Sequence, residues 1–303
     1  MIFDTYGKYI FYDGAMGTML QKFGLKPGDK PDLMNITAPE AVENIHKMYI
    51  EAGSDIICTN TFGSNALNLK DTGYTVEQII TAAVGNAKRA VDSCANKARH
   101  CSATKVALDI GSTGQLLEPV GDLEPERAYE LFKEMATAGE KAGADFVAIE
   151  TMSDIEEVKT AMTAVKENTK LPMLVTMTFE KSGFTYMGCT PEIFAKTAEE
   201  LGAAAIGFNC SLEPLQMIDI AKRLAALTKL PLIIKPNAGL PDAVSGEYKT
   251  GADEFAAQML PYAEIGVKIV GGCCGTTPEY IKALKESFSV LFEVEGIPST
   301  RWN

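Results

Sequence analysis

The 303-residue sequence predicts an α/β protein built as a single (β/α)8 TIM barrel. Short runs rich in apolar and β-branched residues alternate with longer segments of helical periodicity, which is typical of parallel βαβ units. Eight such units in about 300 residues match the usual size of this barrel. Periodicity alone does not show that a sheet closes, so an open doubly wound sheet is the alternative.

The expected strands are short and apolar, and each is followed by a loop. In chain order they cover residues 8–12, 55–59, 105–110, 145–150, 172–178, 204–209, 231–235 and 267–271. Three of them follow small-residue turns at Gly53, Gly143 and Gly202. Glycine at a helix exit suits a turn from a helix into the next strand.

Four of the intervening helices have a recognisable start, and they are expected over residues 38–52, 154–168, 191–202 and 278–292. A hydroxyl residue stands at each expected N-cap, with proline or an acidic residue in the first turn: Thr37, Ser153, Thr190 and Thr277. A longer helical stretch over 66–102 is expected to break near Gly73 or Gly85. We expect residues 1–292 to form the barrel and residues 293–303 a short C-terminal tail.

The composition excludes some classes of function. The formal charge is 28 − 40 = −12, which argues against a nucleic-acid partner. No apolar run approaches the roughly 20 residues that cross a bilayer, and the first residues lack a signal-peptide pattern. Seven cysteines, an odd number, fit free or metal-bound thiols in a reducing compartment. We therefore expect a cytoplasmic protein with no membrane partner.

Polar or thiol groups follow almost every expected strand. They are Asp13–Thr18, Thr59–Phe62, Asp109–Ser112, Glu150–Thr151, Asn209–Ser211, Lys235–Gly239 and Gly271–Thr277. In a (β/α)8 barrel the active site is assembled where the strands end at their carboxyl side. The sequence therefore predicts a functional site at this rim.

Three cysteines at the rim form a candidate metal site. Cys273 and Cys274 lie between glycines, and Cys210 ends the strand at 204–209. Three thiolates would leave a fourth tetrahedral position open, and soft sulfur ligands favour zinc. Position alone leaves two other interpretations open, which are packing of buried thiols and a disulfide between the adjacent cysteines. Packing alone is expected for Cys58, Cys94 and Cys101.

The two histidines are expected to face solvent. His46 lies in the first predicted helix, and His100 lies in a polar segment. With so little imidazole, ordinary histidine acid–base chemistry is disfavoured and thiolate chemistry gains weight.

A set of motifs in a fixed order gives a resemblance to a known family. These are Asp13-Gly-Ala-Met-Gly-Thr18, Thr59-Asn-Thr-Phe62, Glu150-Thr151, Gly207-Phe-Asn-Cys210, Pro236-Asn-Ala-Gly239 and Gly271-Gly-Cys-Cys-Gly-Thr-Thr-Pro278. From about residue 8 to 292 the chain resembles the homocysteine S-methyltransferase family. It is most similar to the homocysteine-binding N-terminal barrel of cobalamin-dependent methionine synthases.

The resemblance implies roles for particular residues. Cys210, Cys273 and Cys274 would be zinc ligands and catalytic, and Glu150 would take the amino group of homocysteine. The remaining residues implied in substrate binding are Asp13, Gly14, Ala15, Met16, Gly17, Thr18, Asn60 and Asn209. For Asp13 and Asn60 plain turn or cap chemistry is the alternative.

The resemblance also implies a zinc-dependent transferase that holds homocysteine as a thiolate and methylates it to methionine. No Asp-x-His-x-x-Gly corrinoid motif is present in the sequence. The similarity to the methionine-synthase barrel favours a methylcorrinoid on a separate protein as the methyl donor. The alternatives are a small donor such as S-methylmethionine or a betaine, another thiol or selenol acceptor, or the demethylating direction. A non-enzymatic zinc or redox sensor is a further alternative. Cys189, after the strand at 172–178, has no assigned role.

Overall fold

The computed structural model describes residue 3 and residues 8–95, 104–242 and 248–294. Eight strands form one parallel sheet in the order β1-β8-β7-β6-β5-β4-β3-β2. Their bounds are β1 Ile10–Phe11, β2 Ile56–Cys58, β3 Lys105–Ile110, β4 Phe146–Met152, β5 Met173–Met177, β6 Ala205–Asn209, β7 Leu232–Lys235 and β8 Ile269–Val270.

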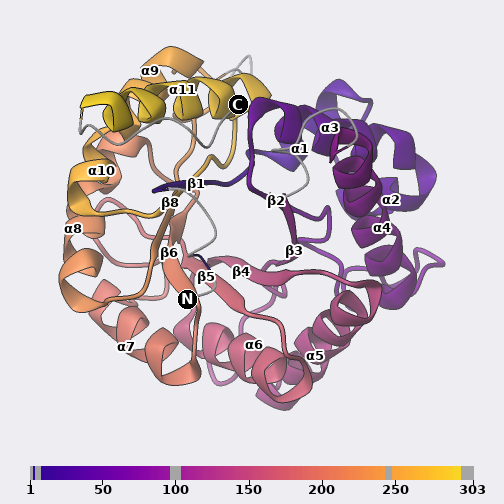
Figure 1. Cartoon of the computed structure of the whole chain (residues 1–303). Coiled ribbons are helices and arrows are strands. Elements are labelled where there is room, and N and C mark those ends of the chain that lie inside the picture. Colours follow the sequence, from indigo (N-terminus) through magenta and orange to yellow (C-terminus); the bar gives the residue numbers. More distant parts are fainter. Residues whose placement is uncertain (1–2, 4–7, 96–103, 243–247, 295–303) are drawn as a thin grey trace.

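The sheet curls into a ring, with the helices outside it (Figure 1). A parallel bridge between Tyr12 and Ile56 joins β1 to β2, the two ends of the strand order. The hydrogen bond from the Asp13 amide to the Ile56 carbonyl, at 3.0 Å, supports the same junction. The (β/α)8 barrel is therefore confirmed, and the open doubly wound sheet is excluded.

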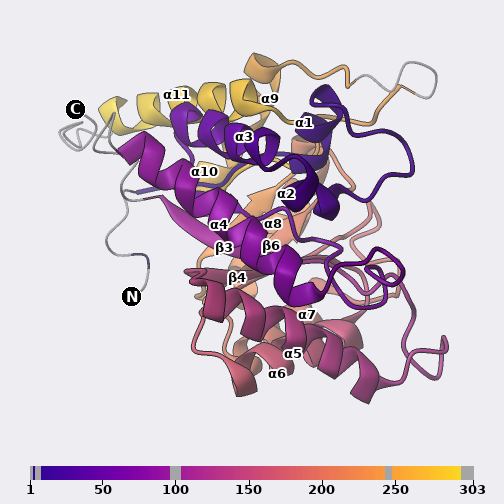
Figure 2. The ribbon, with the colours of Figure 1, turned by 90° about the vertical axis from the view of Figure 1, so that its right-hand side faces the viewer.

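The helices and 3-10 turns surround this ring, and the loops that follow the strands gather at one end of it (Figure 2). Their bounds are α1 Met16–Lys22, η1 Pro31–Leu33, α2 Met34–Thr37, α3 Pro39–Ala52, α4 Val76–Ala95, α5 Pro125–Ala142, α6 Ile155–Asn168, α7 Pro191–Leu201, η3 Pro214–Met217, α8 Ile218–Leu227, α9 Ala252–Met259, α10 Pro261–Ile265 and α11 Pro278–Val294.

The expected long helix at 66–102 is shorter than predicted. It begins at Val76, after Gly73 has adopted a φ of +80°, and it continues through Gly85 without a break. Residues 96–103, with His100 and Cys101, lie outside the described residues, as do 295–303 of the expected tail.

The expected caps have mixed outcomes. The Thr190 hydroxyl accepts a hydrogen bond from the Ile193 amide, as predicted. Thr37 does not cap α3, because its hydroxyl donates to the Leu33 carbonyl within the preceding turn. The cap of α6 is Asp154 and not Ser153. At the other end, Gly53, Gly143 and Gly202 all have the left-handed conformation expected of helix C-caps.

The expectation that His46 faces solvent is wrong. His46 is fully buried on the same face of α3 as Val42, Ile45 and Tyr49. Relative to His46, Val42 and Ile45 lie four and one positions earlier, and Tyr49 lies three positions later. This is the spacing of residues on one helix face. Burial lowers the pKa of His46 to about 4, so the ring is neutral near pH 7.

The barrel interior changes character along its axis. One packed cluster fills its lower part and contains, among others, Ala107, Ala148, Leu174, Ala205 and Ile233. Side chains alternate between the two faces of a strand, so the residue two positions further along also points inward. At that level four strands supply polar side chains, namely Asp109, Glu150, Thr176 and Lys235, and Asn209 follows on β6 four positions after Ala205. The core thus ends in a polar layer directly below the mouth.

Within the described parts of the chain, no helix combines the length and the apolar character needed to cross a membrane.

Candidate metal and substrate site

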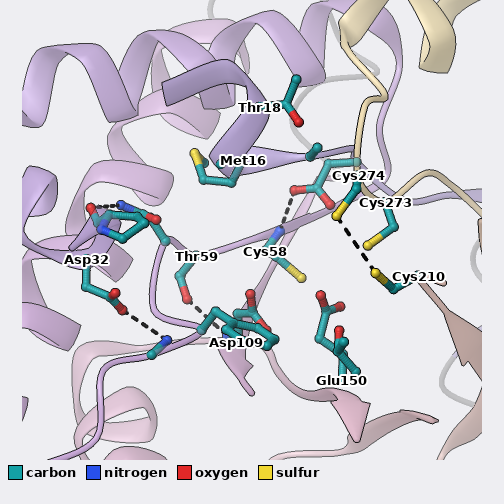
Figure 3. A pocket seen from close by; sticks show the side chains of 18 of the residues that line it. Met16, Thr18, Asp32, Cys58, Thr59, Asp109, Glu150, Cys210, Cys273 and Cys274 are labelled. Carbon is teal, nitrogen blue, oxygen red and sulfur yellow. Dashed lines mark hydrogen bonds between the residues drawn. The ribbon is translucent and has the colours of Figure 1, made fainter. Parts of the chain in front are cut away.

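A cavity of about 540 Å³ opens at the mouth of the barrel, above the polar layer. It is lined by all of the predicted site residues except Asn209. Two chemically different walls face each other across it (Figure 3). Cys210, Cys273 and Cys274 form one wall, and the carboxylates of Asp109 and Glu150 lie on the other.

The three sulfurs fit a tetrahedral zinc ion. Their Sγ atoms all lie within 4.8 Å of one another, and those of Cys210 and Cys274 are 3.8 Å apart. Zinc–sulfur bonds of about 2.3 Å at tetrahedral angles place two sulfurs about 3.8 Å apart. All three cysteines are free and only partly buried in this structure, and no disulfide joins Cys273 to Cys274. The residues present therefore fit the metal that the resemblance implies.

The backbone turns Cys210 toward β8. Cys210 and Ser211 have φ angles of +64° and +65°, a conformation that non-glycine residues rarely adopt. The Cys210 amide donates to the Lys235 carbonyl at 3.0 Å, and the Cys273 amide donates to the Pro236 carbonyl at 2.8 Å. Both cysteines are thus hydrogen-bonded to the end of β7, between their own strands.

Asn209 lies behind the cavity wall. Its Oδ1 accepts hydrogen bonds from the Thr151 amide at 2.9 Å and the Thr176 hydroxyl at 2.8 Å. Its Nδ2 donates to the Thr151 hydroxyl at 2.7 Å and approaches Cys273 Sγ at 3.7 Å. Asn209 is fully buried, so the structure places it against a sulfur and not on the cavity surface.

Negative charge in the sulfur cluster concentrates on Cys210. Hydrogen bonds from the Cys273 and Cys274 thiols lower the pKa of Cys210 to about 3. The same interaction with Cys210 raises the pKa of Cys274 to about 11 and that of Cys273 well above its usual value. Two further residues contact the cluster and were not predicted: Asn237 hydrogen-bonds to Cys210, and Tyr248 hydrogen-bonds to Cys274.

The opposite wall holds a buried ion pair. Lys235 Nζ lies 2.5 Å from Glu150 Oε2 and 4.3 Å from the centre of the Tyr12 ring. Burial opposes the charge on Lys235, but Glu150, Cys58 and Asp13 outweigh it and raise the pKa of the lysine well above its usual value. Lys235 is therefore charged, and one carboxylate oxygen of Glu150 is occupied.

Asp13 has one carboxylate oxygen in use and one free. Its Oδ2 accepts a hydrogen bond from the Cys58 amide at 2.7 Å. Its Oδ1 is buried without a hydrogen-bond partner among the described residues. Burial raises the pKa of Asp13 to about 7. Turn chemistry therefore explains the hydrogen bond to Oδ2 of Asp13 but not the buried, unpartnered Oδ1.

The other predicted residues near the mouth have structural contacts. Asn60 donates from Nδ2 to the Pro31 carbonyl at 2.8 Å, so its side chain holds a neighbouring loop. Met16, Gly17 and Thr18 form the first turn of α1, and the Thr18 hydroxyl accepts from the Gly275 amide. A Cβ at Gly14 would lie 2.6 Å from the Thr276 hydroxyl, so this close approach requires glycine.

The remaining cysteines divide into two kinds. Cys94 and Cys189 are buried in apolar clusters away from the cavity, as packing predicts for Cys94. Cys58 is buried too, but it lines the cavity, and its Sγ lies within 4.8 Å of carboxylate oxygens of Asp109 and Glu150. Packing alone is therefore an incomplete description of Cys58.

Asp109 and Lys235 were not predicted as site residues, although both stand at strand ends. Alternation along the strands would have indicated them, because each lies two positions after an inward-facing apolar residue. Burial raises the pKa of Asp109 well above its usual value, and Glu150 adds to this effect.

The fold and the site together define a class of protein: a (β/α)8 barrel with a cluster of three thiols at its mouth, facing a buried acidic wall. The sequence profile of homocysteine S-methyltransferases matches residues 10–288. The chain belongs to the homocysteine S-methyltransferase family.

Two methionine synthases agree with this assignment, and one solved structure has the same fold. Methionine synthases of Mycobacterium leprae and Mycobacterium tuberculosis are each 32% identical to the chain over 286 residues, covering 89% of it. The chain covers only 23% and 24% of those two proteins. The metallated form of the homocysteine methyltransferase MmuM from Escherichia coli has the same fold, with a TM-score of 0.80 at 21% identity, covering 94% of this chain and 98% of that one.

Proposed function

We propose that this barrel binds zinc through Cys210, Cys273 and Cys274 and methylates homocysteine to methionine. The observation that carries the proposal is the arrangement of three sulfurs, spaced as a tetrahedral metal requires, on one wall of a cavity whose other wall is acidic. Homocysteine has a thiol at one end and an ammonium group at the other, so its two ends match the two walls.

Zinc in this position would keep the acceptor thiol deprotonated near pH 7, where a free thiol is mostly protonated. The protein supplies the remaining requirements. Asn209 donates toward Cys273 and fixes its orientation, as hydrogen bonds to metal-binding residues commonly do. Glu150 faces the cavity with a carboxylate that attracts the amino group. The acceptor sulfur attacks the methyl carbon in line, and the electron pair of the broken bond stays with the donor.

The favoured donor is a methylcorrinoid on a separate protein. The support is the similarity to methionine synthases, of which this chain covers less than a quarter. A small methylated donor is the second candidate, because a cavity of about 540 Å³ is larger than homocysteine needs. A panel of methylcobalamin, a methylated corrinoid protein, S-methylmethionine, betaine and methylfolate, each supplied with homocysteine, distinguishes the two.

The zinc assignment is tested by replacing its ligands. Cys210→Ala and Cys273→Ala are expected to lose zinc and methyl transfer while the barrel stays folded. Cys94→Ala is the matched control, because this cysteine is buried in an apolar cluster away from the cavity. Elemental analysis gives the zinc content, and circular dichroism reports the fold. Full zinc content in both ligand variants would contradict the proposal.

A further inference from the structure

We propose that Asp109 binds the ammonium group of the amino-acid substrate directly, together with Glu150, and thereby selects thiols that carry an amino group. The inference rests on the proposed function, since homocysteine is the substrate that would be selected.

Asp109 has a carboxylate oxygen that lacks a partner inside the structure. The residue is 8% exposed and lines the cavity, and its Oδ1 is buried with no hydrogen-bond partner in the described part of the chain. Leaving a buried carboxylate oxygen unpaired is costly. A donor brought by a ligand would remove that cost.

The backbone of Asp109 is held firmly. Its amide donates to the Thr59 hydroxyl at 3.1 Å, and its carbonyl accepts from the Thr61 hydroxyl at 2.7 Å. These two hydroxyls also hydrogen-bond to each other at 2.7 Å. The carboxylate is thus presented from a fixed backbone, as a recognition group needs to be.

The carboxyl groups in this wall outnumber the cations. Asp13, Asp109 and Glu150 supply three carboxyl groups, whereas Lys235 is the one basic side chain among the described cavity-lining residues that lies close to them. Lys235 already lies on Glu150, so neither Asp13 nor Asp109 has a cation of its own, and burial raises the pKa of both. A substrate ammonium group beside these carboxyls would lower both pKa values and favour their charged forms.

The distances allow one nitrogen to reach both carboxylates. Carboxylate oxygens of Asp109 and Glu150 lie within 4.8 Å of each other. A nitrogen between two such oxygens can make hydrogen bonds of about 2.8 Å to both. The free Oδ1 of Asp13 lies on the same cavity. The charged Lys235 beside Glu150 would repel a divalent metal ion there, so an organic ammonium group fits better.

The inference is tested by comparing two thiols that differ in the amino group. Calorimetry of the zinc-loaded protein measures binding of L-homocysteine and of 4-mercaptobutanoic acid, which lacks that group. Asp109→Asn is expected to weaken homocysteine binding by about 10- to 100-fold, the usual effect of losing a hydrogen bond to a charged group. Binding of 4-mercaptobutanoic acid should be unchanged or tighter, and the zinc content should stay at one.

Glu157→Gln is the matched control. Glu157 is also a buried carboxylate, but it lies outside the cavity and accepts hydrogen bonds from the Thr113 amide and hydroxyl at 2.7 and 2.8 Å. This variant should bind both thiols as the wild type does. If Asp109→Asn does not fold, Asp109→Ser is measured with the same two thiols, because the preference of the wild type alone would not separate Asp109 from Glu150.

Asp109→Asn would overturn the inference if it lost binding of both thiols equally or bound homocysteine as the wild type does. A second metal ion bound at Asp109 and Glu150 would also overturn it. A wild type that binds both thiols equally would overturn the inference but leave the proposed function standing. A wild type that binds neither thiol would refute the proposed function itself.

Discussion

Sulfur and carboxylate groups face each other across one cavity at the mouth of this barrel. The sulfurs of Cys210 and Cys274, 3.8 Å apart, suit a soft metal, and the buried carboxylates suit an organic cation. At the scale of single residues, binding of a metal by the sulfurs and of an organic cation by the carboxylates accounts for the burial of so many ionisable groups in a small volume.

Glu150 lies on the acidic wall of the cavity and gives the first prediction. Glu150→Ala is expected to weaken homocysteine binding strongly and to leave the zinc content unchanged, because its carboxylate lines the cavity but does not belong to the cluster of three sulfurs. Calorimetry and elemental analysis check the two quantities separately. An equal loss of zinc and homocysteine would contradict the assignment of Glu150 to the amino group.

His46 gives a prediction about stability. Its pKa is about 4 in the folded protein and about 6.5 in an unfolded chain, so only the unfolded chain takes up a proton between these values. The free energy of unfolding should therefore fall as the pH falls below about 6.5, by about 2 kcal/mol at pH 5.

His46→Leu should remove this part of the pH dependence. Urea unfolding of chelator-treated wild type and variant at pH 7.5 and pH 5 measures it. Parallel losses of stability in the two proteins would contradict a buried neutral histidine.

At the scale of single elements, local pattern predicted most of the structure. Seven of the eight strands lie within their expected ranges, and β4 extends two residues beyond its range, to Met152. Alternation of short apolar runs with helices has few other solutions. The predicted cap of α3 was wrong because the Thr37 hydroxyl donates to the Leu33 carbonyl instead. A cap motif in the sequence does not reveal this competing hydrogen bond. His46 could have been placed correctly, since its spacing from Ile45 and Tyr49 already marks the buried face.

The two threonines expected as caps, Thr190 and Thr37, give a matched test. Thr190→Ala should lower the free energy of unfolding by about 1 kcal/mol, because the Ile193 amide loses its acceptor. Thr37→Ala should cost clearly less, because the Thr37 hydroxyl does not cap α3. Urea unfolding at one pH compares them. Equal losses in the free energy of unfolding of the two variants would contradict a stabilising cap at Thr190.

The contact between β6 and β7 is close enough to require glycine. A Cβ at Gly207 would lie only 1.7 Å from the Ile233 carbonyl oxygen, so Gly207→Ala must push the strands apart. We expect a loss of about 3 kcal/mol or more and a weaker zinc site, since Cys210 follows β6 directly. Gly251→Ala is the control, because nothing lies near its added methyl group. Similar stability of the two variants would contradict the tight register.

At the scale of the whole molecule, the site depends on contacts that no local pattern contains. The strand-end cysteines and Glu150 could be predicted because one rim of the barrel collects every strand end. The ion pair between Glu150 and Lys235 joins residues 85 positions apart, and it appears only once the ring has closed. Because their contacts form only in the closed barrel, the sequence does not distinguish Asp109 and Lys235 from ordinary residues at strand ends.

The sulfurs lie at the mouth and the packed core lies below them, which predicts how the molecule responds to metal removal. A chelator should abolish homocysteine binding while the barrel remains folded, with far-ultraviolet circular dichroism unchanged. Added zinc should restore binding. Unfolding on chelation would mean that the metal holds the fold together, which this arrangement does not predict.

The central claim is that the acceptor sulfur completes a zinc site made by Cys210, Cys273 and Cys274. X-ray absorption at the zinc edge, recorded with and without L-selenohomocysteine, tests it most directly. We expect three sulfur neighbours from the protein and, once the ligand is added, a new selenium neighbour on the same zinc. A spectrum without zinc–selenium scattering at saturating ligand, or with fewer than three sulfur neighbours, would contradict the claim.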